Sequence, residues 1–156
     1  MSYARMNAES KIVSDCKDTR YSACLLFSAN ALARAMAAIG DDEFGKLGLA
    51  YSHAYLLREV IDKPGVNPTH LSEVLFLTPS TITRLIEKLE LKGLVTRRSE
   101  GKNTLVDPTE KGNALSDELW EAWQRTWTRY AAAIGEEEAL NLTKQVFKAA
   151  KALGEV

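Results

Sequence analysis

The chain has 156 residues, of which 46% are hydrophobic and 26% are charged, with nine Gly and four Pro. This composition is typical of a globular, helix-rich protein and excludes a disordered one. The formal net charge is −1, but residues 84–102 carry six basic and three acidic side chains, whereas residues 107–156 carry nine acidic and six basic ones. The imbalance favours a polyanionic partner that meets only the middle of the chain.

Two helices are predicted in the first part of the chain. Apolar residues recur at spacings of three and four from Leu25 to Ile39, and Gly40 with the two following aspartates predicts the end of this first helix. Ser52 is the expected N-cap of a second helix, whose inward side chains lie between 54 and 61. Pro64 and Gly65 predict its end.

Two short helices are predicted next, and the same sequence pattern marks the start of each. Asn67-Pro68 and Thr78-Pro79 both pair a capping residue with a proline at the first helical position, and Gly93 predicts the end of the second of these helices. Their expected inward residues are Leu71, Val74 and Leu75 in the first, and Ile82, Leu85, Ile86 and Leu89 in the second. Two short helices separated by three or four residues predict a helix-turn-helix.

The rest of the chain predicts a hairpin and two long helices. The runs 94–98 and 104–107 are β-prone and are joined by a loop at 99–103, which is the pattern of a wing. Pro108-Thr109 is expected to cap a long fifth helix, and Gly135 separates it from a sixth that ends near 153. The predicted fold class is mainly α: a winged helix-turn-helix core with a small β-hairpin wing, flanked by long N- and C-terminal helices.

The second helix of the helix-turn-helix has the composition of a reader of the DNA major groove. Its outward side carries Ser80, Thr81, Thr83, Arg84, Glu87 and Lys88. Short hydroxyl side chains let a recognition helix approach the bases closely, and arginine pairs with guanine. Any surface helix also has a polar outer face, so the neighbouring hairpin matters: Arg97, Arg98 and Lys102 are placed there to meet flanking phosphates or the minor groove.

The segment 67–112 resembles the winged helix of the multiple antibiotic resistance regulator (MarR) family. The family pattern L-S-x-x-L, S-x-S-T-V-T-R-L-I-x-x-L-E, K-G-L-V-x-R and L-T-x-x-G is matched in this order at 71–72, 79–90, 92–97 and 108–112. The resemblance implies one domain over 1–156, with a DNA-binding core at 45–108 and dimerisation helices at 10–40 and 109–154.

The resemblance also implies which residues contact double-stranded DNA. Ser80, Thr81, Thr83 and Arg84 would contact bases from the recognition helix, which also presents Lys88, while Thr69, Arg97, Arg98 and Lys102 would contact the backbone or form the wing. The loop at 99–103 is about three residues shorter than the usual wing of the family and lacks its Asp-x-Arg element, so Lys102 is a substitute candidate. Phe76 occupies the turn, where a small or polar residue is more usual, either as a buried plug or as an exposed contact.

The flanking helices are expected to form a homodimer. Trp120, Trp123, Trp127, Tyr130 and Ile134 form an apolar stripe that is either core or, as the resemblance implies, part of a dimer interface. A two-fold dimer would place two recognition helices about 34 Å apart on a palindromic operator. We therefore predict a transcriptional repressor released by an effector. The alternative is a winged helix without DNA binding that serves as a protein-interaction module, as the near-zero net charge and short wing suggest.

Relatives in this family commonly respond to small phenolic or aromatic ligands. Tyr51, Tyr55, Trp120, Trp123 and Trp127 are candidates to line such a site, although ordinary core packing also accounts for them. Cys16 and Cys24 suggest redox sensing, because some relatives use an N-terminal cysteine. On one helix, however, the two would lie about 12 Å apart, too far for a disulfide, so inert buried thiols are favoured.

Other functional classes find little support in the sequence. His53 and His70 lack companion ligands at metal spacing and are expected to be ordinary polar residues, so no metal or cofactor is predicted. No glycine-rich phosphate loop or nucleophile elbow occurs, which argues against an enzyme. The polar first twenty residues and the interrupted apolar stretch at 23–39 argue against a signal peptide or membrane span, and we expect a cytoplasmic protein.

Overall fold

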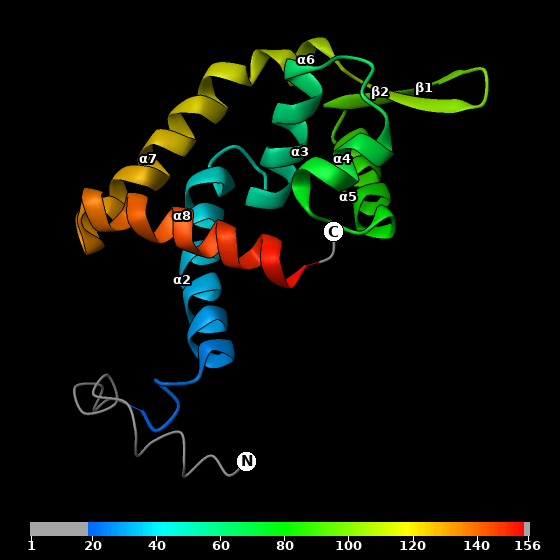
Figure 1. The fold of residues 1–156 in the computed structure, drawn as a ribbon. Coiled ribbons are helices and arrows are strands. Elements are labelled where there is room, and N and C mark those ends of the chain that lie inside the picture. The colour runs from blue at the N-terminus through cyan, green and yellow to red at the C-terminus, as the bar shows by residue number, and fades with distance from the viewer. Residues whose placement is uncertain (1–18, 155–156) are drawn as a thin grey trace. The chain divides into compact units, whose positions relative to one another are not determined.

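The computed structural model describes residues 19–154 and divides the chain after Ala38 into two compact units. Helix α2 (Leu25–Gly45) belongs to both units, and α3 (Tyr51–Asp62), α4 (Pro68–Leu75) and α5 (Pro79–Leu91) follow. The hairpin of β1 (Val95–Glu100) and β2 (Asn103–Pro108) comes next, and the last helices are α6 (Glu110–Ala114), α7 (Ser116–Ile134) and α8 (Glu136–Leu153). This is the mainly α winged-helix fold that the sequence predicted (Figure 1).

Helix α3 is the centre of the second unit, where it packs against α4, α5, α6, α7 and β2. Its Leu56, Leu57 and Val60 are fully buried. The inward residues predicted for α5 are all buried, and they join α3, Val106 of β2 and Leu119 of α7 in one core. Because this core fixes the inner side of α5, the opposite side of that helix is turned to solvent.

The first two predicted helix boundaries were wrong. Helix α2 does not end at Gly40 but continues to Gly45, because Phe44 is buried and anchors the last turn. A Cβ on Gly40 would lie 3.2 Å from that of Tyr51, so this glycine permits close packing rather than ending the helix. Ser52 does not cap α3: the helix begins at Tyr51, whose N–H donates to Asp41 Oδ1 at 3.0 Å.

Three later predictions also need correction. Val74 of α4 is 40% exposed and not inward. The strands extend into the predicted loop, so that Gly101 and Lys102 alone connect Glu100 to Asn103. The long fifth helix is two helices, because the Leu115 N–H bonds to Gly112 O in a tighter turn at the junction of α6 and α7.

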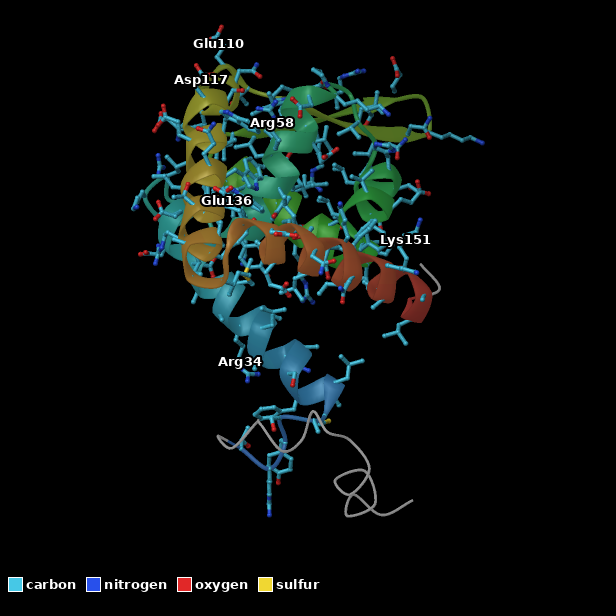
Figure 2. The ribbon with its side chains drawn as sticks, turned by 60° about the vertical axis from the view of Figure 1, so that its left-hand side comes forward. Arg34, Arg58, Glu110, Asp117, Glu136 and Lys151 are labelled. Carbon is cyan, nitrogen blue, oxygen red and sulfur yellow. The ribbon has the colours of Figure 1, made fainter. Side chains whose placement is uncertain are left out.

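The last helix matches its predicted bounds. Glu136, Glu137 and Glu138 lie in its first turn and Lys151 in its last, which complements the helix dipole. Glu136 and Lys151 are seen at opposite ends of α8 in Figure 2. None of the helices in residues 19–154 is long and apolar enough to cross a membrane.

Candidate nucleic-acid interface

The two helices of the helix-turn-helix begin as the sequence predicted. Asn67 Oδ1 accepts the N–H of His70 at 2.8 Å, and Thr78 Oγ1 accepts the N–H of Thr81 at 3.3 Å. Each cap is followed by a proline, whose fixed φ suits the first helical position. The caps therefore set the start of α5, and with it which side chains point outward.

Phe76 occupies an unusual position in the turn between these helices. Its φ of 54° lies in the left-handed region. No other non-glycine residue in the described part of the chain has a positive φ. Its ring is partly exposed and meets the edge of Phe147 on α8, with centroids 5.8 Å apart. Phe76 is thus an exposed contact between the turn and the last helix rather than a buried plug.

The outward side of α5 carries hydroxyl groups at its start and cations farther along. Thr78 Oγ1 lies 3.1 Å from Ser80 Oγ and 2.9 Å from Thr81 Oγ1, and Thr83 Oγ1 donates to Pro79 O at 3.0 Å. Ser80, Thr83, Arg84 and Lys88 are exposed, whereas Thr81 is half-buried.

Arg84 and Lys88 are the available positive charges of this face. Within residues 19–154, the side chains of Arg84 and Lys88 make no hydrogen bond or ion pair. A guanidinium presents several fixed donors that match the acceptors of guanine or of a phosphate. Arg84 and Lys88 can therefore bind an anionic partner without breaking an internal contact.

The wing arginines differ from this, because both are engaged within the protein. Arg97 Nη2 lies 2.6 Å from Glu90 Oε2, and Arg98 Nε lies 2.7 Å from Asp107 Oδ2. The hydrogen bond to Glu90 raises the pKa of Arg97, and the hydrogen bond to Asp107 raises that of Arg98. Both arginines are exposed, yet their charges are largely neutralised by carboxylates.

Lys102 lies at the tip of the wing, in the two-residue turn with Gly101, whose φ of +62° suits glycine. Figure 1 shows the hairpin extending away from the helices of the winged helix. Between the wing and the start of α4 lies a cleft of about 600 Å³. Thr69 and Lys102 line it together, and so does the carboxylate-bearing Glu73.

The candidate effector residues are only partly brought together. Trp120, Trp123 and Trp127 line a hollow of about 640 Å³ on α7, together with Gln124, Thr128 and Tyr130. Tyr55 lies outside its lining but meets the Trp123 ring at 5.3 Å, and Tyr51 meets Tyr55 at 6.4 Å. Burial and, to a smaller degree, Tyr55 raise the pKa of Tyr130. The sequence did not single out Gln124 or Thr128, because polar residues on a helix carry no signal of their own.

The cysteine and histidine candidates are placed as follows. Cys16 lies outside the described residues, and Cys24 precedes α2 and is partly buried. His70 is half-buried beside the cleft, where it shares the lining with Glu73. His53 is no ordinary polar residue: it is buried, and neither ring nitrogen has a hydrogen-bond partner among the described residues. Within those residues no cluster suited to a metal ion occurs.

Comparisons with known proteins agree with this geometry. The sequence profile of the MarR family matches residues 47–103, which span α3, the helix-turn-helix and most of the wing. The transcriptional regulator SarZ of Staphylococcus epidermidis is 30% identical over 108 residues, covering 67% of this chain and 72% of SarZ. The chain belongs to the MarR family of transcriptional regulators.

Two further regulators are similar over much of the chain. The uncharacterised regulator YybA of Bacillus subtilis is 30% identical over 94 residues, which cover 58% of this chain and 63% of YybA. A MarR-family regulator from Listeria monocytogenes, whose crystal structure was solved in complex with 26-mer DNA, is 26% identical and has a TM-score of 0.69. That match covers 83% of this chain and 88% of the Listeria chain.

Proposed function

We propose that this MarR-family regulator is a homodimeric repressor that binds a palindromic operator and is released by a small aromatic effector. The observation that carries DNA binding is the outward side of α5, where Arg84 and Lys88 are exposed and have no partner within residues 19–154. The similarity to the DNA-bound Listeria regulator supports the same conclusion. We assign 45–108 to the DNA-binding core and the helices on either side, in one domain over 1–156, to dimerisation.

The proposed contacts fall into two groups. Ser80, Thr81, Thr83, Arg84 and Lys88 enter the major groove, where Arg84 reads a guanine. Thr69 and Lys102 meet the phosphate backbone where it passes the cleft between α4 and the wing. Because α4 begins beside this cleft, the positive end of its helix dipole favours a phosphate there.

Fluorescence anisotropy with a labelled duplex tests DNA binding directly. We expect the affinity to fall as salt rises, with a slope of about −0.9 in log K against log salt for each phosphate contacted. Fragments selected from a random pool should bind far more tightly than unselected duplexes, by about a thousandfold or more. A folded protein that shows no salt-dependent binding to any duplex would instead be a protein-interaction module.

Exposed apolar side chains support the dimer. Leu153 of α8 is 80% exposed, Leu140 and Phe147 of the same helix are also exposed, and Trp120 of α7 is 58% exposed. Large apolar side chains exposed in this way are typical of an interaction surface. Because Leu153 is exposed within one chain, Leu153→Glu should leave the fold intact but weaken the dimer, whereas Lys144→Glu should not. Sedimentation would reject the interface if the wild type is a folded monomer at all concentrations.

The hollow on α7 supports the aromatic effector. Its tryptophans offer stacking surfaces, and Gln124, Thr128 and Tyr130 offer polar groups. Titration with 4-hydroxybenzoate should quench tryptophan fluorescence and release the labelled duplex. Trp120→Ala should weaken both effects, whereas Tyr51→Phe, outside the hollow, should not. Quenching that is unchanged in Trp120→Ala would place the effector elsewhere.

A further inference from the structure

On both outer edges of the wing hairpin, main-chain groups of one cross-strand pair of residues form hydrogen bonds with other parts of the protein. Arg97 and Val106 face each other across the hairpin. On the β2 edge, Val106 N–H donates to Val66 O at 2.9 Å, and Val106 O accepts the Gly65 N–H at 3.0 Å. On the β1 edge, Arg97 N–H donates to Glu90 Oε1 at 3.0 Å. The hairpin is therefore held between the residues before α4 and the last turn of α5.

The carboxylate of Glu90 binds Arg97 twice. One oxygen accepts the Arg97 main-chain N–H, and the other lies 2.6 Å from the guanidinium. The Glu90 side chain is 26% exposed and that of Arg97 is 39% exposed. Because one group fixes both the strand and its side chain, this contact constrains the direction of β1 more than an ordinary surface ion pair does.

Arg98 is also held by contacts within the protein. Besides its contact with Asp107, Arg98 Nη1 lies 3.5 Å from Glu100 Oε1. A Cβ on Gly65 would lie 3.0 Å from Arg98 Nη2, so the guanidinium rests on this glycine. An arginine that exchanged its carboxylate for a DNA phosphate would gain one ion pair, lose another and leave a carboxylate facing the DNA.

We propose that Glu90 is a positioning residue for DNA binding, which aims the wing relative to the recognition helix through Arg97. In this arrangement Arg97 and Arg98 hold the wing in place and do not contact phosphate. Lys102 is the residue of the wing that contacts a DNA phosphate. This replaces the role that family resemblance implied for the two arginines, and it rests on the proposed DNA-binding function. Glu90 was missed in the sequence because its partner lies beyond the turn at Gly93.

The salt dependence of duplex binding distinguishes an anchor from a phosphate contact. Arg97→Ala should weaken binding with an unchanged salt slope, whereas Lys102→Ala should reduce the slope by about 0.9. Glu90→Arg combined with Arg97→Glu should bind DNA more tightly than Arg97→Glu alone, because the exchange re-forms the ion pair although it leaves the main-chain N–H of residue 97 without its acceptor. The matched control combines Glu118→Arg with Arg97→Glu, because Glu118 is an exposed carboxylate on α7 that forms no ion pair with any described residue. A reduced slope in Arg97→Ala, or equal affinity of the two double variants, would overturn the proposal.

Hydrogen exchange in the full-length protein without DNA provides a second measurement. Glu90→Ala should speed exchange in peptides that cover β1, Glu90→Gln should do so less because it keeps an acceptor oxygen, and Glu87→Gln should not. Unchanged exchange in Glu90→Ala would show that Glu90 does not hold β1 in place through Arg97, whatever the result of the DNA-binding experiments. A wild type that binds no duplex would overturn both the proposed function and the positioning role. The exchange data would still show whether the contact between Glu90 and Arg97 holds β1 in place.

Discussion

A Cβ atom on Gly112 would lie 2.1 Å from the main-chain oxygen of Leu94, so α6 crosses the start of the wing at a distance that only glycine permits. Thr109, which caps α6, reinforces this crossing: its N–H donates to Leu94 O at 3.1 Å and its hydroxyl to Gly93 O at 2.7 Å. The final glycine of the sequence motif at 108–112 is thus explained by packing between α6 and the wing.

Gly112→Ala should therefore destabilise the fold by about 1–3 kcal/mol, because the added methyl group meets backbone that cannot move aside easily. Gly45→Ala is the matched control, since a Cβ there would have no described atom within 4 Å beyond its chain neighbours and the backbone of its own helix. Urea unfolding followed by circular dichroism measures both. Equal stability of the two variants would contradict the close crossing.

Glu43 is expected to make stability depend on acid. It is buried near the end of α2, and hydrogen bonds from Lys46 and Arg125, together with one from Arg129, lower its pKa from 4.5 to about 2. Because the folded state holds this carboxylate charged more strongly than the unfolded state does, its contribution is complete above about pH 4.5. It is then lost as the pH falls toward 2.

Glu43→Gln should accordingly be less stable than the wild type at pH 7, and the difference should shrink steadily as the pH is lowered below 4.5. Urea unfolding at several pH values measures this. Glu118→Gln, an exposed carboxylate on α7, provides the control for a change of charge alone. A stability difference that stays constant from pH 7 to pH 3 would contradict the role of Glu43.

His53 should produce a second pH dependence at milder acidity. Burial, Lys88 and Lys92 lower its pKa below 6.5, against a smaller opposing effect of Asp41. The unfolded state therefore takes up a proton first, so stability should fall as the pH drops below 6.5 and level off below the pKa of the folded state.

Replacing this imidazole should be favourable, because its ring nitrogens are buried without partners in the described part of the chain. His53→Leu is expected to gain about 1 kcal/mol or more at pH 7 and to lose the pH dependence between 7 and 5.5. His70→Asn should retain that dependence. If His53→Leu retains it too, another group causes it.

Much of the fold followed from local signals in the sequence. The capping residues Asn67 and Thr78 and the spacing of apolar residues in α5 each act within a few positions, and the structure confirms them. The end of α2 did not follow, because the fate of Gly40 is decided by Tyr51 and the buried Phe44.

The candidate site shows the same division. The outward side of α5 was predictable, since it is the complement of the buried side. The engagement of Arg97 and Arg98 was not, because it depends on where the hairpin brings Glu90 and Asp107. Sequence identifies the cations of a surface, but only the fold shows which of them are already neutralised.

For the cleft beside the wing we expect a substitution that tightens DNA binding. Glu73 lines it together with Lys102, and a carboxylate there opposes an approaching phosphate. Glu73→Gln should therefore tighten binding to selected and random duplexes alike, by up to severalfold at low salt. Anisotropy measures this, and weaker binding by the variant would show that DNA does not pass this cleft.

Base reading by α5 is tested most directly at Arg84, which is exposed and unpaired within residues 19–154. Arg84→Ala, compared with Lys148→Ala on α8, should be measured by anisotropy on a duplex selected from a random pool and on an unselected one. We expect Arg84→Ala to cost about 1–3 kcal/mol on the selected duplex and much less on the other, with no loss for Lys148→Ala. An equal loss on both duplexes would make Arg84 a phosphate contact and contradict base reading by this residue.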